Sequence, residues 1–368
     1  MTKEKKFKKR KLWQKIIIYL LLIILIIVLV FSALIGYLTL TEFNPDKEVP
    51  LKLTGKSQTN SVNKSREMTA VSWNIGYGAL GSDADFFMDG GKSVDTADKD
   101  GVNKNLKGIS SELNSLNPDF ILLQEVDTDA KRSSYINEAS KLQSELLNQD
   151  YQSSFAENFK VKFIPYPIPP IGKVNAGIMT LSKSRISEAT RVQLPCPFKW
   201  PTRIANLKRC LSINRLPIEG SDKELVIVNL HLEAYDDGDG KKAQAEMLRK
   251  YLQAEADKGN YVIAGGDFNQ TFSGTDTSIM KQFNGTWKPP VLDTNKFDKS
   301  WQFLMDTKTA SCRSLDKPLT SLNTNKFQFY IIDGFIVSSN IKVTSLETKQ
   351  MGFKNTDHNP VILKFKLK

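Results

Sequence analysis

An uncharged apolar run near the N-terminus divides the chain into two parts that must fold in different surroundings. Residues Ile16 to Thr41 include no charged side chain, and Ile, Leu and Val dominate. About 20 such residues span a bilayer as a helix, because each adds roughly 1.5 Å. The run has no polar face, which argues against a helix in a soluble core. It is also longer than the usual core of about 7–15 residues in a signal peptide, and no clean A-x-A site follows. We therefore expect an uncleaved transmembrane helix at 16–41.

Positive charge is concentrated before this run. The chain has 51 Lys or Arg, 40 Asp or Glu and a net charge of +11. Residues 1–15 hold eight of the basic residues and one Glu, a net +7, which leaves +4 for everything that follows. The positive-inside rule then predicts a basic cytoplasmic tail at 1–15 and an extracellular location for the chain after Thr41. The sequence thus indicates a single-pass protein of the cell membrane.

The rest of the chain divides into a linker and one large domain. Residues 42–67 hold two prolines and a polar stretch without apolar period, which indicates a linker. Residues 68–368 are long enough for an extensive core. Many strand-like runs with few amphipathic helices favour α/β layers and a mixed sheet. Helical spacing is found at 102–116, 135–146 and 243–254, and strands are expected at 69–75, 120–126, 175–182, 210–216, 224–232, 261–268, 329–337 and 361–367.

The cysteine pattern leaves two states open. The three cysteines are Cys196, Cys210 and Cys312. In an oxidising compartment Cys196 and Cys210 could pair, and unbridged buried thiols are an equal alternative. No C-x-x-C pair is present, so a structural zinc site is not expected.

Polar side chains lie at the ends of several predicted strands, inside one strand and just before the last one. A carboxylate, amide or imidazole flanked by Ile, Val and Leu costs free energy unless it is paired or bound to a metal. The chain has only two histidines, and both belong to this set. Its members are Asn74, Gln124, Glu125, Asn229, His231, Asp267, Asn269, Asp333, Asp357 and His358. So many such positions predict a shared site.

The chain resembles the endonuclease/exonuclease/phosphatase superfamily in six motifs that follow one another in the same order. They are SWNIGYG, LLQEVD, VNLHLEA, GGDFNQ, YIIDGF and TDHNPV. The resemblance covers roughly 68–368. It implies a four-layer α/β sandwich of the pancreatic-deoxyribonuclease type, in which two mixed sheets are flanked by helices. It also implies a metal-dependent hydrolase of phosphoric esters whose site lies at one edge of the sandwich.

By motif match, the metal side of the site comprises Glu125, Asn74 and Asp357. Glu125 is similar to the main Mg²⁺ ligand of the family, and Asn74 lies beside it on the metal or its water. Asp357 is expected close to the metal. Mg²⁺ prefers oxygen ligands and often takes only one or two carboxylates, and Mn²⁺ is a possible substitute.

The acid–base side of the site follows from the same resemblance. Asp267 is expected to orient or activate the attacking water, with Asn269 bonded to the phosphoryl group or positioning Asp267. His358 resembles the family's acid–base residue, held by Asp333, and His231 is expected to contact a phosphate oxygen or protonate the leaving group. The resemblance does not decide which histidine is base and which is acid. In-line attack without a covalent intermediate is expected.

Two asparagines, Asn229 and Asn175, are expected to contact the substrate, whose identity the motifs leave open. One possibility is a small phosphorylated compound or a phospholipid headgroup. A tethered nuclease for DNA or RNA is the alternative, although the mild charge after residue 15 argues against tight duplex binding. A catalytically silent surface sensor is the third possibility. The apolar, Pro-rich segment 161–172 is expected either to pack on the core or to touch lipid. No obligate protein partner is inferred.

Overall fold

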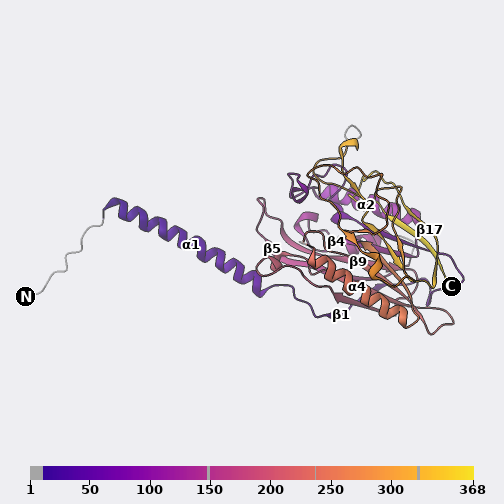
Figure 1. The fold of residues 1–368 in the computed structure, drawn as a ribbon. Helices are drawn as coiled ribbons and strands as arrows, with labels where there is room; N and C mark the ends of the chain where they lie inside the picture. The colour runs from indigo at the N-terminus through magenta and orange to yellow at the C-terminus, as the bar shows by residue number, and fades with distance from the viewer. Residues whose placement is uncertain (1–10, 147–149, 237, 321–323) are drawn as a thin grey trace, which may run out of the picture. The chain divides into compact units, whose positions relative to one another are not determined.

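The computed structural model describes residues 11–146, 150–236, 238–320 and 324–368. The chain divides into two compact units, Met1–Glu42 and Phe43–Lys368 (Figure 1). Within the described part of the first unit lies one helix, α1 (Leu12–Leu40). By length and composition it is the one helix among the described residues that could cross a membrane. A signal sequence at this place would have the same properties.

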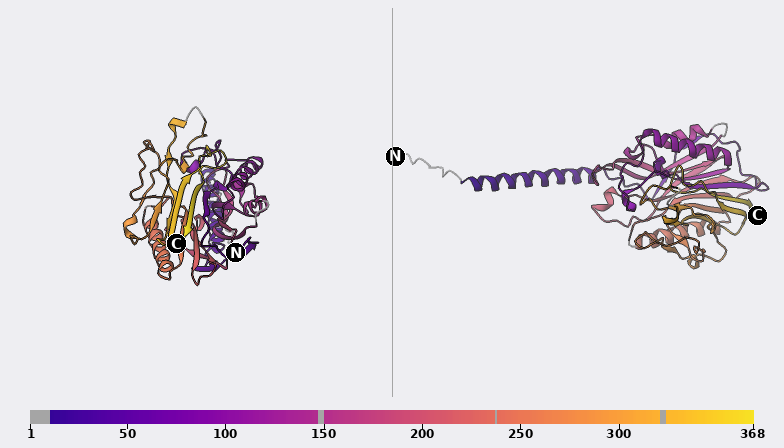
Figure 2. Two further views of the ribbon diagram at one scale, coloured as in Figure 1. Left: turned by 90° about the vertical axis from the view of Figure 1, so that its right-hand side faces the viewer. Right: turned by 90° about the horizontal axis from the view of Figure 1, so that it is seen from above.

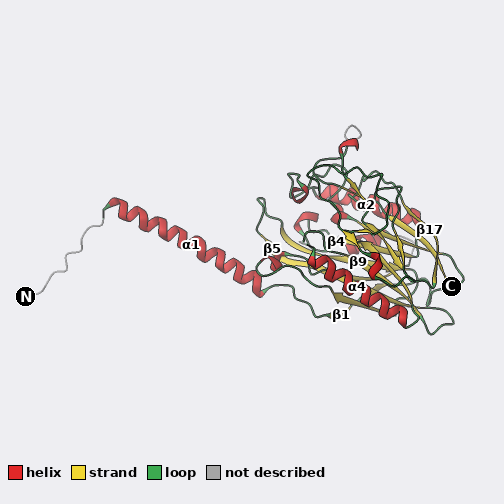
Figure 3. Ribbon diagram, viewed as in Figure 1, coloured by secondary structure: helices red, strands yellow, loops and turns green. Residues whose placement is uncertain are grey.

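Two mixed seven-stranded sheets form the second unit (Figure 3). The first sheet has the order β1-β7-β8-β9-β10-β16-β13. Its strands are β1 (Glu48–Pro50), β7 (Glu188–Gln193), β8 (Cys210–Pro217), β9 (Glu224–His231), β10 (Tyr261–Asp267), β16 (Asp333–Val337) and β13 (Gln302–Leu304). The second sheet has the order β17-β18-β3-β4-β6-β5-β2. Its strands are β17 (Ile341–Thr348), β18 (Val361–Leu367), β3 (Met68–Asn74), β4 (Phe120–Asp127), β6 (Gly172–Ser182), β5 (Gln152–Ile164) and β2 (Leu53–Gly55).

Three helices cover the outer faces of these sheets. They are α2 (Lys99–Leu116), α3 (Glu138–Glu145) and α4 (Asp239–Asp257). The left view of Figure 2 shows α2 and α4 on opposite sides of the strands. Two short pairs, β11 (Thr271–Phe272) with β12 (Val291–Leu292) and β14 (Cys312–Arg313) with β15 (Phe329–Tyr330), complete the strands. The predicted four-layer sandwich is confirmed.

Strict alternation of side chains along the central strands explains the layers. On β3, Ala70 belongs to the core between the two sheets, whereas Val71 packs in the core that includes α2 residues. On β9, Ile227 belongs to the core between the sheets and Val228 packs in the core that includes α4 residues. Successive side chains of a strand point to opposite faces, so a strand that is apolar at every position is buried on both.

The structure differs from the sequence-based expectations in several segments. Residues 42–67, expected as a linker, contain β1 and β2, which pair with β7 and β5 on different sheets. The strands β5, β7 and β17 were not predicted, because their polar residues interrupt the apolar runs. The strand expected at 329–337 is two strands, since the carbonyls of Ile331 and Ile332 accept hydrogen bonds from Thr271 and Phe268 outside the main sheets. Of the two cysteine states that the sequence left open, the structure has the unbridged one, with all three thiols free.

Candidate active site

The parallel pairs β3–β4 and β9–β10 bring four strand ends to one edge of the sandwich. Asn74 is in register with Gln124, and His231 is in register with Asp267. The amide of Asn74 then joins the two sheets, because its Nδ2 donates to Asp267 Oδ2 at 3.1 Å. The polar residues predicted from the separate motifs therefore meet at the carboxyl ends of strands from both sheets, as the resemblance implied.

Glu125 reaches this edge through an irregularity in its strand. The register between β4 and β6 shifts between Leu123 and Val126, and Glu125 has a φ of 54°. A bulge of this kind re-aims a side chain, and a non-glycine residue at positive φ stores strain that often marks a functional site. The Glu125 carboxylate is 25% exposed and accepts a hydrogen bond of 3.2 Å from Asn74 Nδ2. It is therefore the carboxylate of this cluster most open to solvent.

Both histidines face Asp267. The distance from His231 Nε2 to Asp267 Oδ2 is 3.5 Å, and that from His358 Nε2 to the same oxygen is 3.8 Å. On its other side, His358 Nδ1 lies 2.8 Å from Asp333 Oδ2. Asp267 and Asp333 are also register partners on β10 and β16. This array of two imidazoles and two carboxylates is buried.

The surroundings push the pKa values of the two histidines in opposite directions. Burial lowers the pKa of His231, and the nearby Arg209 and His358 lower it further. Burial also opposes charge on His358, but Asp333 and the neighbouring anionic groups raise its pKa well above the usual value. The surroundings therefore disfavour a proton on His231 and favour one on His358. Titratable neighbours with opposed shifts are a signature of acid–base sites.

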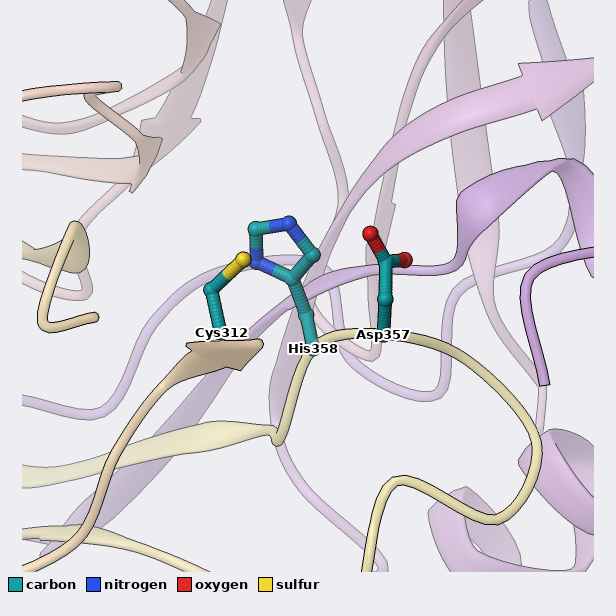
Figure 4. Close-up of side chains that lie close together, drawn as sticks. All are labelled: Cys312, Asp357 and His358. Carbon is teal, nitrogen blue, oxygen red and sulfur yellow. The ribbon is translucent and has the colours of Figure 1, made fainter. Parts of the chain in front are cut away.

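His358 and Asp357 lie on the loop before β18, and Cys312 on β14 lies on the other side of the His358 ring (Figure 4). The backbone of Cys312 pairs with that of His358 in an isolated antiparallel β-bridge. Burial raises the pKa of the Cys312 thiol to about 12. Burial raises the pKa of Asp357 to about 6, with His358 opposing the shift and Glu125 adding to it. The sequence analysis placed Asp357 near the metal and did not single out Cys312 for the site.

The donor set fits a hard divalent cation. Burial raises the pKa of Asp267 to about 7, with Asp333 adding to the shift. Asp357 is raised as well, and Asp333 Oδ1 is buried without a hydrogen-bond partner in the described structure. Carboxylates gathered in this way repel one another until a proton or a cation neutralises them. Glu125, Asp357 and the amide of Asn74 offer the oxygen ligands that Mg²⁺ and Mn²⁺ prefer. Asp267, Asp333 and His358 also lie close enough together to hold an ion.

The three predicted asparagines at this edge have different surroundings. Asn269, at a φ of 50°, donates its backbone N–H to Asp267 Oδ1 at 2.8 Å, which holds that carboxylate in place. Asn175 has a buried side-chain oxygen without a partner in the described structure, and its substrate role stays a prediction. Asn229 is fully buried. Its Nδ2 donates to the carbonyls of Leu123 and Met179, and its Oδ1 accepts from Gln124. These bonds tie Asn229 to the scaffold, and the substrate-binding role stays a prediction for Asn229 as well.

Arg132 and Tyr77 are site residues that the sequence analysis missed. The Arg132 guanidinium forms a bidentate pair with Asp127 at 3.0 and 2.9 Å. It also lies 3.8 Å from the centroid of the Tyr77 ring. Tyr77 has a φ of 40° and a buried hydroxyl without a partner in the described structure, near Glu125 and Asp357. Asp127 ends the LLQEVD motif of an apolar strand. A buried carboxylate needs a cationic partner, so this position could have indicated a nearby Arg or Lys such as Arg132.

A second buried ion pair lies behind His231. Arg209 Nε is 3.2 Å from Glu233 Oε2, and Arg209 Nη1 donates to the carbonyl of His231 at 3.2 Å. Glu233 also accepts the backbone N–H groups of Ala234 and Tyr235, each at 3.0 Å. The pair fixes the chain directly after His231 and places a positive charge next to the imidazole. No pattern in the sequence linked these two residues.

Comparisons with known proteins identify the family and the fold of this domain. Residues 71–317 match the model of the endonuclease/exonuclease/phosphatase family. No curated protein sequence matches the chain. Among solved structures, an endonuclease/exonuclease/phosphatase from Beutenbergia cavernae has a TM-score of 0.55 at 16% identity, with 82% of this chain and 72% of that chain covered. The catalytic domain of human Nocturnin with bound sulfate has a TM-score of 0.51 at 17% identity, covering 86% and 98%.

A third similar structure is ANGEL2, a 2′,3′-cyclic phosphatase in complex with adenosine-2′,3′-vanadate, with a TM-score of 0.53 at 14% identity. The match covers 87% of this chain and 99% of that chain. At such identities these neighbours establish the fold, and the family model, which spans most of the chain, establishes the family. The protein belongs to the endonuclease/exonuclease/phosphatase family of phosphoesterases.

Proposed function

We propose that the protein is a membrane-anchored, Mg²⁺-dependent hydrolase of phosphoric esters that uses water directly as the nucleophile. The observation that carries this proposal is the position of Asp267 between two oppositely tuned imidazoles, 3.5 Å from His231 Nε2 and 3.8 Å from His358 Nε2. Phosphoryl transfer needs positioning and charge neutralisation more than covalent chemistry, and this cluster is built for both. The described edge of the sandwich supplies acid, base and cation ligands together.

The residues divide the work by their charge. When bound, Mg²⁺ polarises the phosphate and neutralises charge that develops on it, and Glu125, Asp357 and Asn74 are the residues that would hold it. The cationic His358, held by Asp333, donates to a phosphate oxygen or to the leaving group. Asp267, in contact with the neutral His231 and held by the N–H of Asn269, orients the attacking water and accepts its proton.

The experiment that tests this function is an assay of the solubilised full chain with Mg²⁺ or Mn²⁺ on a substrate panel. The panel comprises bis-p-nitrophenyl phosphate, inositol phosphates, sphingomyelin, plasmid DNA and RNA. We expect His231→Ala and His358→Ala each to lower kcat by about 10²–10⁴-fold, while Asp222→Ala, exposed on the turn between β8 and β9, leaves it unchanged. Near-normal activity of both histidine variants would refute the assignment. Metal binding without turnover on any substrate would favour the sensor alternative.

The anchor is the second part of the proposal. We infer that α1 is retained as a transmembrane span with residues 1–15 in the cytoplasm and the domain outside. The support is its length, its apolar composition and the basic residues before it. Ser221→Cys, on an exposed turn between β8 and β9, should react with a membrane-impermeant maleimide in intact cells. Labelling only after lysis would reverse the orientation, and loss of an N-terminal tag from the mature chain would show a cleaved signal.

A further inference from the structure

Three segments of the domain leave the sandwich at the same edge as the active site. Strand β6 runs antiparallel to β4 with Ala176 opposite Asp127, so the β5–β6 hairpin continues past the end of β4 that carries Glu125. The loop 194–209 joins β7 to β8 at the end of the first sheet where His231 and Asp267 lie. Strand β1 begins at this end as well, because Glu48 pairs with Val192 near the end of β7.

The chain enters the domain at this edge on a very short connection. Helix α1 ends at Leu40, and the domain begins at Phe43. An extended residue spans at most about 3.6 Å, so Phe43 stays within about 10 Å of the end of α1. The Phe43 ring lies 5.7 Å from Lys160 Nζ on β5 and 5.6 Å from the Arg191 guanidinium on β7. Only two residues, Thr41 and Glu42, thus separate the end of α1 from the domain.

The tip of the β5–β6 hairpin is the apolar part of this edge. The last paired residues are Ile164 and Gly172, so the tip lies beyond Asn175 by three residues of strand, roughly 10 Å. Residues 163–170, FIPYPIPP, carry no charge. Tyr166 is 75% exposed and Ile168 is 91% exposed. Figure 1 shows this hairpin projecting from the domain at the end labelled β5. Ile164 is buried in the hydrophobic cluster with Phe159 and Val161, so the base of the hairpin packs on the domain while Tyr166 and Ile168 stay exposed.

A neighbouring loop adds an indole to the same surface. Ala205 and Leu207 pack against the hydrophobic cluster of the hairpin that includes Phe159 and Val161. This contact holds the loop beside β5, and its Trp200 is 55% exposed. Lys162 and Lys199 are exposed beside the apolar residues. We call residues 163–170 together with Trp200 the apolar tip.

We propose that the apolar tip docks into the interfacial layer of the same membrane that α1 spans. This inference rests on the proposed membrane anchor. Tyr and Trp favour the boundary between headgroups and acyl chains, where one end of the side chain is apolar and the other wet. Lys162 and Lys199 complement anionic headgroups at the same depth. A membrane anchor keeps the domain beside a lipid surface, and the two lysines match its anionic headgroups, which favours lipid over a protein partner as the occupant. Docking also holds the mouth of the active site next to the headgroups.

Lipid-quenching of a single fluorophore tests the docking. The full chain with Cys196→Ser and Ile168→Cys carries an NBD label at the tip, since Cys210 and Cys312 are buried. It is reconstituted into phosphatidylcholine–phosphatidylglycerol vesicles that contain lipids with nitroxides at known depths. The matched control carries the label at Ser221→Cys, on the turn at the opposite edge of the first sheet. We expect quenching several-fold greater at 168 than at 221, strongest from a nitroxide near the headgroup.

Equal quenching at 168 and 221 would overturn the docking proposal. If the chain still floated with the vesicles, the membrane anchor itself would stand. Failure to float would remove the anchor and the docking together, whereas turnover of a soluble ester would be untouched by either result. Protection of the label from aqueous iodide without lipid quenching would point to a protein occupant and also overturn the proposal. A second test places the label at Thr202→Cys, an exposed position two residues after Trp200 in the loop 194–209. Adding Tyr166→Ser and Ile168→Ser should weaken lipid quenching of this label and leave the turnover of bis-p-nitrophenyl phosphate unchanged.

Discussion

Asn229 and His231 lie two residues apart on the same face of β9, and their surroundings differ completely. The Asn229 carboxamide is neutral and has hydrogen-bond partners on both of its polar atoms. His231 has a buried Nδ1 without a partner in the described structure, and its Nε2 faces two carboxylates. A polar group whose hydrogen bonds are all made holds the sheets together, whereas a buried group without a partner at the edge retains capacity for a ligand. The difference separates scaffold from site along a single strand.

The cluster of titratable groups around His231 is the side of this comparison that predicts the largest effect. Asp333→Asn removes the carboxylate that keeps His358 cationic, so kcat should fall by about 10²–10⁴-fold. Because Asp333 raises the pKa of His358, its loss lowers that pKa. The limb of the pH–kcat profile that needs protonated His358 should then move to lower pH. An unchanged profile with reduced kcat would show that His358 does not act as the acid.

The satisfied side predicts a loss of stability without a loss of chemistry. Asn229→Ala leaves Gln124 and two backbone carbonyls without their partner, at a cost of about 3 kcal/mol in the free energy of unfolding. Urea denaturation of the detergent-solubilised chain measures this change, and kcat of the folded fraction should stay within a few-fold of the parent. A fall in kcat with unchanged stability would return Asn229 to the substrate-binding role and break the comparison.

Metal binding tests whether the under-satisfied edge holds a cation. Mg²⁺ at about 100 times its Kd should stabilise the fold by about 2.7 kcal/mol, read as a rise in Tm that EDTA reverses. The rise should shrink in Glu125→Gln, which keeps the shape of the side chain and removes its charge. Asn229→Ala is the control, since a structural amide should not alter the Mg²⁺-dependent part of Tm. An equal rise in the parent and in Glu125→Gln would place the ion elsewhere.

Glu138 offers a smaller test, because it is buried like Asn229 but ionisable like Asp267. Its Oε2 accepts the N–H of Asp127, and its Oε1 is buried without a partner in the described structure. Burial, with Asp127 adding to it, raises the pKa of Glu138 well above the usual value. Ionisation therefore costs stability as pH rises from the unfolded pKa through the folded one. Glu138→Gln should be neutral near pH 4 and stabilising near pH 7, as urea denaturation at the two pH values would measure. Equal effects at both pH values would contradict the raised pKa.

Residue patterns predicted the central strands of the sandwich and missed its margins. Strands such as β4 and β10 are apolar at almost every position because they are covered on both faces, and that pattern is visible in a sequence. β7 and β17 are amphipathic and partly exposed, and β1 and β2 are only three residues long. Those strands exist because neighbours offer them hydrogen bonds. The same limit applies to Arg132 and Arg209, whose acidic partners become obvious only when the chain is folded.

The sequence by itself determined the apolar N-terminal segment, the alternation that builds a layered α/β domain, and the polar strand ends with both histidines. These are local properties, set by the order of side chains along one element. Only the tertiary structure decided that both polar atoms of Asn229 are bonded within the scaffold, that Asp333 and Asp267 lie beside His358, and that the apolar hairpin tip shares one edge with these polar residues. Those outcomes depend on distances between segments far apart in the chain, and burial and electrostatic coupling are properties of that packing.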